Sequence, residues 1–286
     1  MTDDQRPGFS DIDAYGLSHT GKVRTENQDH FFVGALARGV VVDSTNVTET
    51  GRPLVNAERL ATLAVVADGV GGRPGGAEAS RLVVRDLVAA VSQSFHEAES
   101  LEPEDPEAFS RLLQDAALAC HESLLRLAED EGRRPATTVT LFLGLWPHAY
   151  LLQVGDSRCY IFKEGKLSQI SRDQTWAQDL VDSGALTRTM AEQSKWAGVL
   201  SSAVGGEAAT PEVTRVVRDW GTVVLLCSDG LTKHVSDELI EERLATMTSS
   251  RQAAEQLLQD ALDGGGTDNV AIVVGRTLRS DESRPK

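Results

Sequence analysis

Cysteine is scarce in this sequence, and its spacing excludes the usual structural roles of the residue. Cys120, Cys159 and Cys227 make an odd number and show no CxxC spacing. Each lies in an apolar stretch, so we expect three buried thiols in a reducing compartment and no disulfide framework. The six histidines show neither an HExxH nor an HxxxH spacing. Zinc chemistry therefore has little support.

Long hydrophobic runs are also missing. No stretch of about 18 apolar residues is present, which argues against a helix that spans a membrane. Residues 1–13 are polar and acidic and lack the apolar centre of a signal peptide. The sequence therefore predicts a cytoplasmic protein without a membrane partner.

Positive charge is low relative to negative charge. The 28 Lys and Arg residues face 43 Asp and Glu residues, which gives a formal net charge of −15. Such a balance repels nucleic acid and anionic membranes, and it is compatible with divalent cations or basic protein partners. Composition supports equally well the plainer interpretation that the charge only keeps the protein soluble. With 41% hydrophobic residues, the chain of 286 residues can form one large domain or two small ones.

Several motifs that bind phosphate or supply a nucleophile are absent. The sequence contains no GxxxxGK[ST] loop and no GxSxG elbow. The glycine-rich segment after Asp68 does not fit GxGxxG, because Pro74 falls where the last glycine should be. A nucleophile must come from elsewhere, and water activated by a metal ion is the natural candidate.

The pattern of apolar residues predicts strands in groups and helices in pairs. Residues 1–10 and 278–286 are expected to be flexible tails around a single body at 11–277, without a linker or repeat. Period-3.6 patterns predict helices that begin at Ala77 and Pro106. Further helices are predicted at 237–245 and 250–262. Strands are predicted at 12–19, 29–34, 60–67, 137–145, 149–154, 159–163, 166–170, 213–217, 222–227 and 270–275. This order favours antiparallel sheets stacked on each other and covered by helices.

Aspartates recur at the ends of the predicted strands, each beside a glycine or a small polar residue. They are Asp68, Asp156, Asp229 and Asp268. A single aspartate of this kind is more often a turn former than a site residue. Several of them, together with the glycine-rich segment 69–76, favour a binding site, because glycine lets backbone carbonyls approach a ligand. Converging carboxylates repel one another, and Mg²⁺ and Mn²⁺ prefer oxygen ligands. The sequence therefore indicates a site for hard divalent cations.

Six short motifs follow one another along the chain. They are RTENQD at 24–29, ADGVGG at 67–72, TTVT at 137–140, VGDSR at 154–158, CSDG at 227–230 and GTDN at 266–269. Together they resemble the PPM-type, protein phosphatase 2C family of metal-dependent serine/threonine phosphatases, in its bacterial form. The resemblance covers about 15–275. Each motif alone is weak, whereas six in the family's order and spacing are specific.

The resemblance implies an α+β fold, a four-layer α-β-β-α sandwich of two antiparallel sheets. It also implies two Mg²⁺ or Mn²⁺ ions. Asp68 would bridge both ions, and the Gly69 carbonyl would be a further ligand. Asp229 and Asp268 would complete the first metal site.

The resemblance also implies roles for residues around the two ions. Arg24 would clamp the substrate phosphate, which suits a planar guanidinium. Asp29 would hold metal-bound waters, and Asp173 would hold a third, weaker ion. Gln28 and Asn269 would support the site. The alternative for Arg24 is an ordinary surface ion pair.

The sequence departs from the family pattern in three places. Gln28 stands where many members have glutamate, which suggests that Asp68, Gly69 and water mainly hold the second ion. Val70 stands where eukaryotic members have a histidine proposed as general acid, so either a metal-bound water protonates the leaving oxygen or the step needs little help. Pro135 and Ala136 stand where bacterial relatives usually have a glycine-rich segment before the Thr-Thr strand. We interpret this difference as structural.

Three further segments receive structural interpretations. We expect Asp156 to form a buried ion pair with Arg158 that fixes a strand end, rather than to act in catalysis. Residues 179–204 correspond to the flap beside the site in bacterial relatives, and such loops often set substrate choice. Residues 39–59 are expected to form a long hairpin loop.

The predicted reaction is hydrolysis of phosphoserine or phosphothreonine by a metal-activated water in line with the leaving oxygen, without a phosphoenzyme. Phosphoproteins, including a bacterial serine/threonine kinase, are the expected partners of a monomeric enzyme. Two alternatives remain. One is a phosphatase-like signalling or binding module with little turnover, which Gln28 and Val70 favour slightly. The other is a two-metal nuclease, against which the net charge argues.

Overall fold

The structure is a computed structural model that describes residues 6–37, 40–46, 59–70, 75–97, 106–131 and 134–279. It contains a six-stranded and a five-stranded sheet. The first consists of β2 (Asp29–Leu36), β3 (Val40–Thr45), β4 (Ala61–Asp68), β5 (Val139–Leu145), β6 (His148–Val154) and β9 (Glu212–Val217). The second consists of β1 (Ile12–His19), β7 (Arg158–Lys163), β8 (Lys166–Gln169), β10 (Val223–Cys227) and β11 (Val270–Thr277).

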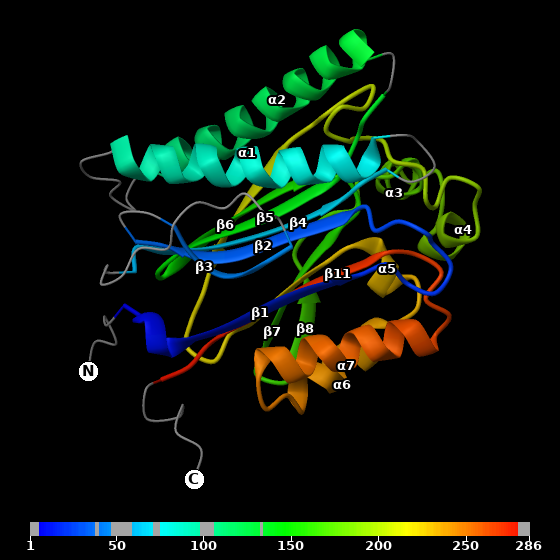
Figure 1. Ribbon diagram of the computed structural model, residues 1–286. Helices are drawn as coiled ribbons and strands as arrows, with labels where there is room; N and C mark the ends of the chain where they lie inside the picture. Colours follow the sequence, from blue (N-terminus) through cyan, green and yellow to red (C-terminus); the bar gives the residue numbers. More distant parts are fainter. Residues whose placement is uncertain are drawn as a thin grey trace.

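The two sheets are antiparallel throughout and are stacked on each other (Figure 1). The strand orders are β3-β2-β4-β5-β6-β9 and β1-β11-β10-β7-β8. Helices α1 (Gly76–Glu97) and α2 (Pro106–Glu131) cover the larger sheet. Helices α6 (Asp237–Ala245) and α7 (Ser250–Asp263) cover the smaller one. The predicted four-layer sandwich is therefore confirmed.

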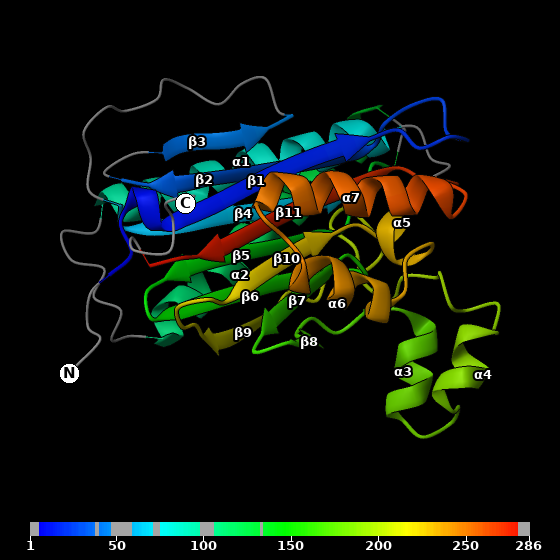
Figure 2. The ribbon, with the colours of Figure 1, turned by 90° about the horizontal axis from the view of Figure 1, so that it is seen from below.

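Short helices gather at one end of the sandwich. They are α3 (Trp176–Asp182), α4 (Arg188–Glu192) and α5 (Asp229–Thr232), and both ribbon views place them at the same end (Figures 1 and 2). A 3₁₀ turn, Phe9–Asp11, precedes β1. In the part of the chain that the structure describes, no helix is both long and apolar enough to cross a bilayer.

The core has one apolar layer between the sheets and one under each pair of helices. Phe31 and Phe142 lie between the sheets, whereas Leu87 of α1 and Leu257 of α7 are buried where each helix packs on its sheet. The cysteines confirm the prediction of buried free thiols, since all three are unpaired and buried. Burial raises the pKa of each thiol, which keeps it protonated and unreactive.

The sequence-based prediction was wrong in one part of the larger sheet. Residues 40–45, expected within a loop, form the edge strand β3, which pairs with β2. The run of valines from Val40 to Val42 explains the strand, because β-branched residues favour extended backbone. The rest of that expected loop, 47–58, lies outside the described residues, as do residues 1–5 and 280–286 of the expected tails.

Strand direction brings distant aspartates to the same end of the two sheets. Asp68 ends β4, and its partner across the antiparallel pair is Asp29, which begins β2. In the other sheet, Asp229 follows the end of β10, and Asp268 precedes the start of β11. Since β10 and β11 are also antiparallel neighbours, these two residues meet at that end as well.

Candidate metal centre

A pocket of about 630 Å³ opens at this end of the sandwich. Most of the predicted site residues line it: Arg24, Gln28, Asp68, Gly69, Asp229, Asp268 and Asn269. Asp29 is fully buried beside Asp68. Neither Asp29 nor Asp173 is part of the lining, and Asp173 forms an ion pair with Arg158 instead.

The Asp68 backbone is fixed by the neighbouring Thr-Thr segment. The Asp68 amide donates to Thr138 Oγ1 at 3.1 Å, and its carbonyl accepts from Thr137 Oγ1 at 2.7 Å. The next residue must be glycine, because a Cβ at Gly69 would lie 2.5 Å from the Gly76 carbonyl. The turn therefore holds the Asp68 carboxylate and the Gly69 carbonyl at the pocket.

Asp29 is a carboxylate with little access to water. Its Oδ2 accepts a hydrogen bond from Ser228 Oγ at 2.6 Å, whereas its Oδ1 is buried without a partner. Burial raises the pKa of Asp29 to about 7. Burial, followed by the charges of Asp29 and Asp229, also raises the pKa of Asp68 well above its ordinary value. Both carboxyl groups therefore hold a proton more tightly than exposed aspartates do, and a bound cation would favour their ionised forms.

Two basic side chains bind the carboxylates on the other side of the pocket. Arg24 contacts Asp268 through Nε at 2.8 Å and Nη2 at 3.1 Å. Lys233 Nζ lies 2.8 Å from Asp268 Oδ2 and 2.6 Å from Asp229 Oδ2. Burial opposes ionisation of Asp268, but hydrogen bonds from Lys233 and Arg24 lower its pKa overall. Lys233 was not predicted as a site residue, although its spacing of four from Asp229 allows the contact.

Asn269 and Gln28 support the site from behind. Asn269 Oδ1 accepts from the Gln28 amide at 2.9 Å, and its Nδ2 donates to the carbonyls of Thr20 and Glu26. These bonds tie the segment that carries Arg24 to the start of β11. The Gln28 side chain packs against Gly76, where a Cβ would lie 3.1 Å from its amide carbon.

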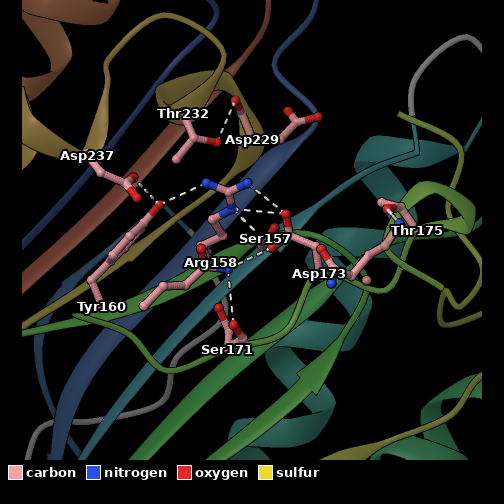
Figure 3. Close-up of polar contacts among 12 residues, drawn as sticks. Ser157, Arg158, Tyr160, Ser171, Asp173, Thr175, Asp229, Thr232 and Asp237 are labelled. Carbon is pink, nitrogen blue, oxygen red and sulfur yellow. Dashed lines mark hydrogen bonds and ion pairs between the residues drawn. The ribbon is translucent and has the colours of Figure 1, made fainter. Parts of the chain in front are cut away.

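The interpretation of Asp156 and Arg158 as an ion pair was wrong. Arg158 pairs instead with Asp173, through Nε at 3.0 Å and Nη2 at 2.7 Å, and donates to the Tyr160 hydroxyl (Figure 3). The Tyr160 hydroxyl in turn donates to Asp237. Hydrogen bonds between Cys159 and residues 170–171 hold the loop after β8 against β7, which places Asp173 beside Arg158.

Asp156 belongs to the pocket, and the sequence-based prediction missed this. It lies in the lining, and burial, followed by the charge of Asp229, raises its pKa to about 8. The sequence signal that could have placed Asp156 in the pocket was its position at a strand end, which it shares with Asp68. Asp156 therefore adds a further carboxylate to the cluster.

This set of carboxylates fits divalent cations. Asp29 Oδ1 and Asp229 Oδ1 are buried oxygens without hydrogen-bond partners, a costly arrangement that a cation would relieve. In the side-chain positions seen here, the described residues form no closed cage of three ligands. Arg24 and Lys233 instead hold the oxygens of Asp268 and Asp229.

The predicted flap forms one wall of the pocket. Trp176, which is half exposed, and the segment around Val199 belong to the lining. Thr175 caps α3 by accepting from the Gln178 amide, and Arg172 pairs with Asp179 at the base of the helix. The flap is thus two short capped helices, α3 and α4, followed by irregular chain.

The two stacked antiparallel sheets covered by helices, with a pocket of carboxylates at one end, define the class of fold, and the comparisons name the family. The family model described as "Protein phosphatase 2C" matches residues 53–264, and the chain belongs to this family.

Relatives and solved structures support this assignment. The serine/threonine protein phosphatase PstP of Mycobacterium tuberculosis is 34% identical over 267 residues, which are 92% of this chain and 45% of PstP. The chain thus spans about half the length of that relative. The protein phosphatase PhpP of Streptococcus pneumoniae is 26% identical over 90% of this chain and 94% of its own. The PstP catalytic domain, solved in complex with two manganese ions, superposes with a TM-score of 0.71 at 29% identity, covering 94% of this chain and 99% of that one.

Proposed function

We propose that this chain hydrolyses phosphoserine and phosphothreonine in proteins, with two Mn²⁺ or Mg²⁺ ions. One observation carries the proposal: carboxylates with unpartnered buried oxygens meet a guanidinium at the mouth of a single pocket. Carboxylates can hold small hard cations, and a guanidinium matches phosphate oxygens. The names of the relatives above and the manganese complex of PstP support the same assignment.

Asp68, the Gly69 carbonyl, Asp229 and Asp268 would hold the two ions, with Asp29 behind them. A third, weaker ion would use Asp173 together with Asp229. When bound, such ions supply positive charge to the phosphoryl oxygens and lower the pKa of water.

Arg24 would orient the substrate phosphate. It lies at the pocket mouth with its guanidinium partly exposed and now engaged by Asp268. An ion that takes the oxygens of Asp268 would weaken this pair and leave the guanidinium available to phosphate. Val70, also in the lining, offers no proton, and the lining contains no histidine among the described residues. The proton on the leaving oxygen would therefore come from water.

The remaining assignments are part of the same proposal. Residues 11–277 would act as a single catalytic domain and as a monomer. The substrates would be phosphoproteins, including a serine/threonine kinase, and the compartment would be the cytoplasm. The three free buried thiols support a reducing compartment.

The test is hydrolysis of a phosphothreonine peptide with Mn²⁺ or Mg²⁺, before and after EDTA. Asp68→Asn and Asp229→Asn should lower kcat at least about 10³-fold, because each removes a ligand charge at the reacting centre. Arg24→Ala should lower kcat/KM about 10²-fold.

Two matched variants serve as controls. Asp219→Asn changes an exposed aspartate that pairs with Lys163, and Arg251→Ala changes an exposed arginine that pairs with Glu255. Both should retain wild-type turnover. Activity that survives EDTA, or full activity of both aspartate variants, would exclude the proposal. A wild-type chain that binds phosphopeptide without turnover would instead identify a binding module.

A further inference from the structure

Lys233 has a fixed place at the edge of the carboxylate cluster. It follows helix α5, and its backbone amide donates to the Asp229 carbonyl at 2.9 Å. The helix itself is anchored, because Leu231 is fully buried and a Cβ at Gly230 would lie 1.8 Å from the Asn269 carbonyl oxygen. The Lys233 side chain therefore begins at a defined point, one helical turn from Asp229.

The Lys233 ammonium joins two carboxylates that come from different parts of the chain. Asp229 follows β10 and Asp268 precedes β11, and Nζ lies within 2.8 Å of an oxygen of each. Both carboxylates are mostly buried, at 21% and 18% exposure of their side chains. Such short contacts to two poorly hydrated carboxylates are stronger than an ordinary surface pair.

The electrostatic environment explains why a cation lies there. The pocket lining has four aspartates, Asp68, Asp156, Asp229 and Asp268, and two basic side chains, Arg24 and Lys233. Carboxylates at this density repel one another. The ammonium group of Lys233 offsets part of that repulsion when no other cation is bound.

We propose that Lys233 is a built-in counter-ion that competes with a divalent cation for Asp229 and Asp268, and thereby sets the metal affinity of the site. The inference rests on the proposed function, since it concerns the same pocket. A small divalent cation would bind carboxylate oxygen at about 2.0–2.2 Å. The ammonium contacts Asp229 Oδ2 at 2.6 Å, and Asp229 Oδ1 has no partner, so a cation at either oxygen of this carboxylate would lie close to the ammonium and be repelled by it. The ammonium thus opposes metal binding unless it moves away from the two carboxylates.

The proposal predicts opposite effects of Lys233 on the metal-free and metal-bound states. Lys233→Met should bind Mn²⁺ about tenfold more tightly, because no ammonium has to leave. The same variant should have a lower Tm in EDTA, because the carboxylates lose their counter-ion. The rise in Tm on adding Mn²⁺ should therefore be larger than in the wild type. Lys233→Arg, which keeps the charge, should stay close to the wild type in both measurements.

The experiment is calorimetric titration with MnCl₂ alone, together with thermal melts in EDTA and in Mn²⁺. Lys163→Met is the matched control, since Lys163 has similar exposure, 39% against 43%, and pairs with Asp219 outside the pocket. Lys233→Gln serves as a second neutral variant in case Lys233→Met folds poorly. The control should leave the Mn²⁺ affinity unchanged.

Unchanged or weaker Mn²⁺ binding by the neutral Lys233 variants would overturn the inference. Equal affinity changes in Lys163→Met would also overturn it, because a general charge effect would then explain them. The affinity readout is independent of turnover. Tighter binding by proteins that do not hydrolyse phosphopeptide would support the role of Lys233 and refute the proposed phosphatase function.

Discussion

Replacement of Asp29 by asparagine should stabilise the metal-free protein at alkaline pH. The Asp29 carboxyl is fully buried, and its pKa is raised from 3.8 to about 7, chiefly by burial. An acid of this kind stabilises the fold while it is protonated, and the contribution is lost as the pH rises from about 4 through about 7. At pH 8 the ionised group is therefore a penalty that asparagine removes.

The size of the effect follows from the pKa. A difference of about 3 pH units is worth about 4 kcal/mol at about 1.4 kcal/mol per unit. Asparagine still accepts the hydrogen bond from Ser228, so we expect a gain on the order of 2–4 kcal/mol at pH 8. For a chain of this length, 1 kcal/mol corresponds to about 2 °C in Tm, so the expected gain is about 4–8 °C. At pH 4.5 the gain should fall to about 1 kcal/mol, because the folded carboxyl is already protonated there.

The assay is a set of thermal melts in EDTA at pH 4.5 and pH 8, repeated at pH 8 with saturating Mn²⁺. In Mn²⁺ the ranking should reverse, because the wild type gains more from the cation than the variant does. Asp219→Asn is the control: Lys163 lowers the pKa of Asp219, so this change should give no gain at pH 8. An unchanged or lower Tm for Asp29→Asn at pH 8, or an equal gain at both pH values, would refute the reasoning.

Two further predictions concern residues that hold the site in place without being charged ligands: Gly69 and Arg158. Gly69→Ala should lower the free energy of unfolding by about 1–3 kcal/mol and reduce turnover, because the new Cβ would lie 2.5 Å from the Gly76 carbonyl. Denaturant melts measure the stability, and phosphopeptide hydrolysis measures the turnover. Wild-type values in both assays would contradict the close packing of Gly69 on Gly76. Arg158→Met should lower the free energy of unfolding by about 3 kcal/mol, because it leaves the partly buried Asp173 carboxylate without its partner. Arg251→Met, on the surface, should change it by less than about 0.5 kcal/mol, and an equal loss in the two variants would refute the structural role of Arg158.

Local sequence was sufficient for most of the secondary structure. The helices that begin at Gly76 and Pro106 follow from their apolar period, and Ile12–His19 and Asp237–Ala245 coincide with the predicted ranges. The edge strand β3 was missed, because the turn-forming residues 43–46 directly follow the valines that favour extended backbone.

Some residues of the site could likewise be predicted from sequence, and others could not. Asp68, Asp229 and Asp268 could be chosen from sequence, because each occurs in a short motif at a strand end and the motifs recur in a fixed order. That the three side chains converge was an inference. The antiparallel pairs β2–β4 and β10–β11 bring the aspartates of each sheet to one end, and the stacking of the two sheets brings these ends together (Figure 1). The partner of Arg158 could not be chosen, because Asp156 and Asp173 are both within reach along the chain, and only the packing of β7 against the following loop selects Asp173.

The sequence by itself determined which side chains are available: the aspartates at strand ends, the glycines beside them, Arg24, and an excess of negative charge. These depend on residue identity and on short-range backbone preferences, which are local. Only the tertiary structure decided which charges face each other. It placed Lys233 between Asp229 and Asp268, and it left Asp29 Oδ1 buried and unpartnered. The reason is physical: electrostatic energy and desolvation depend on distances and burial in space, and strands from two sheets set both.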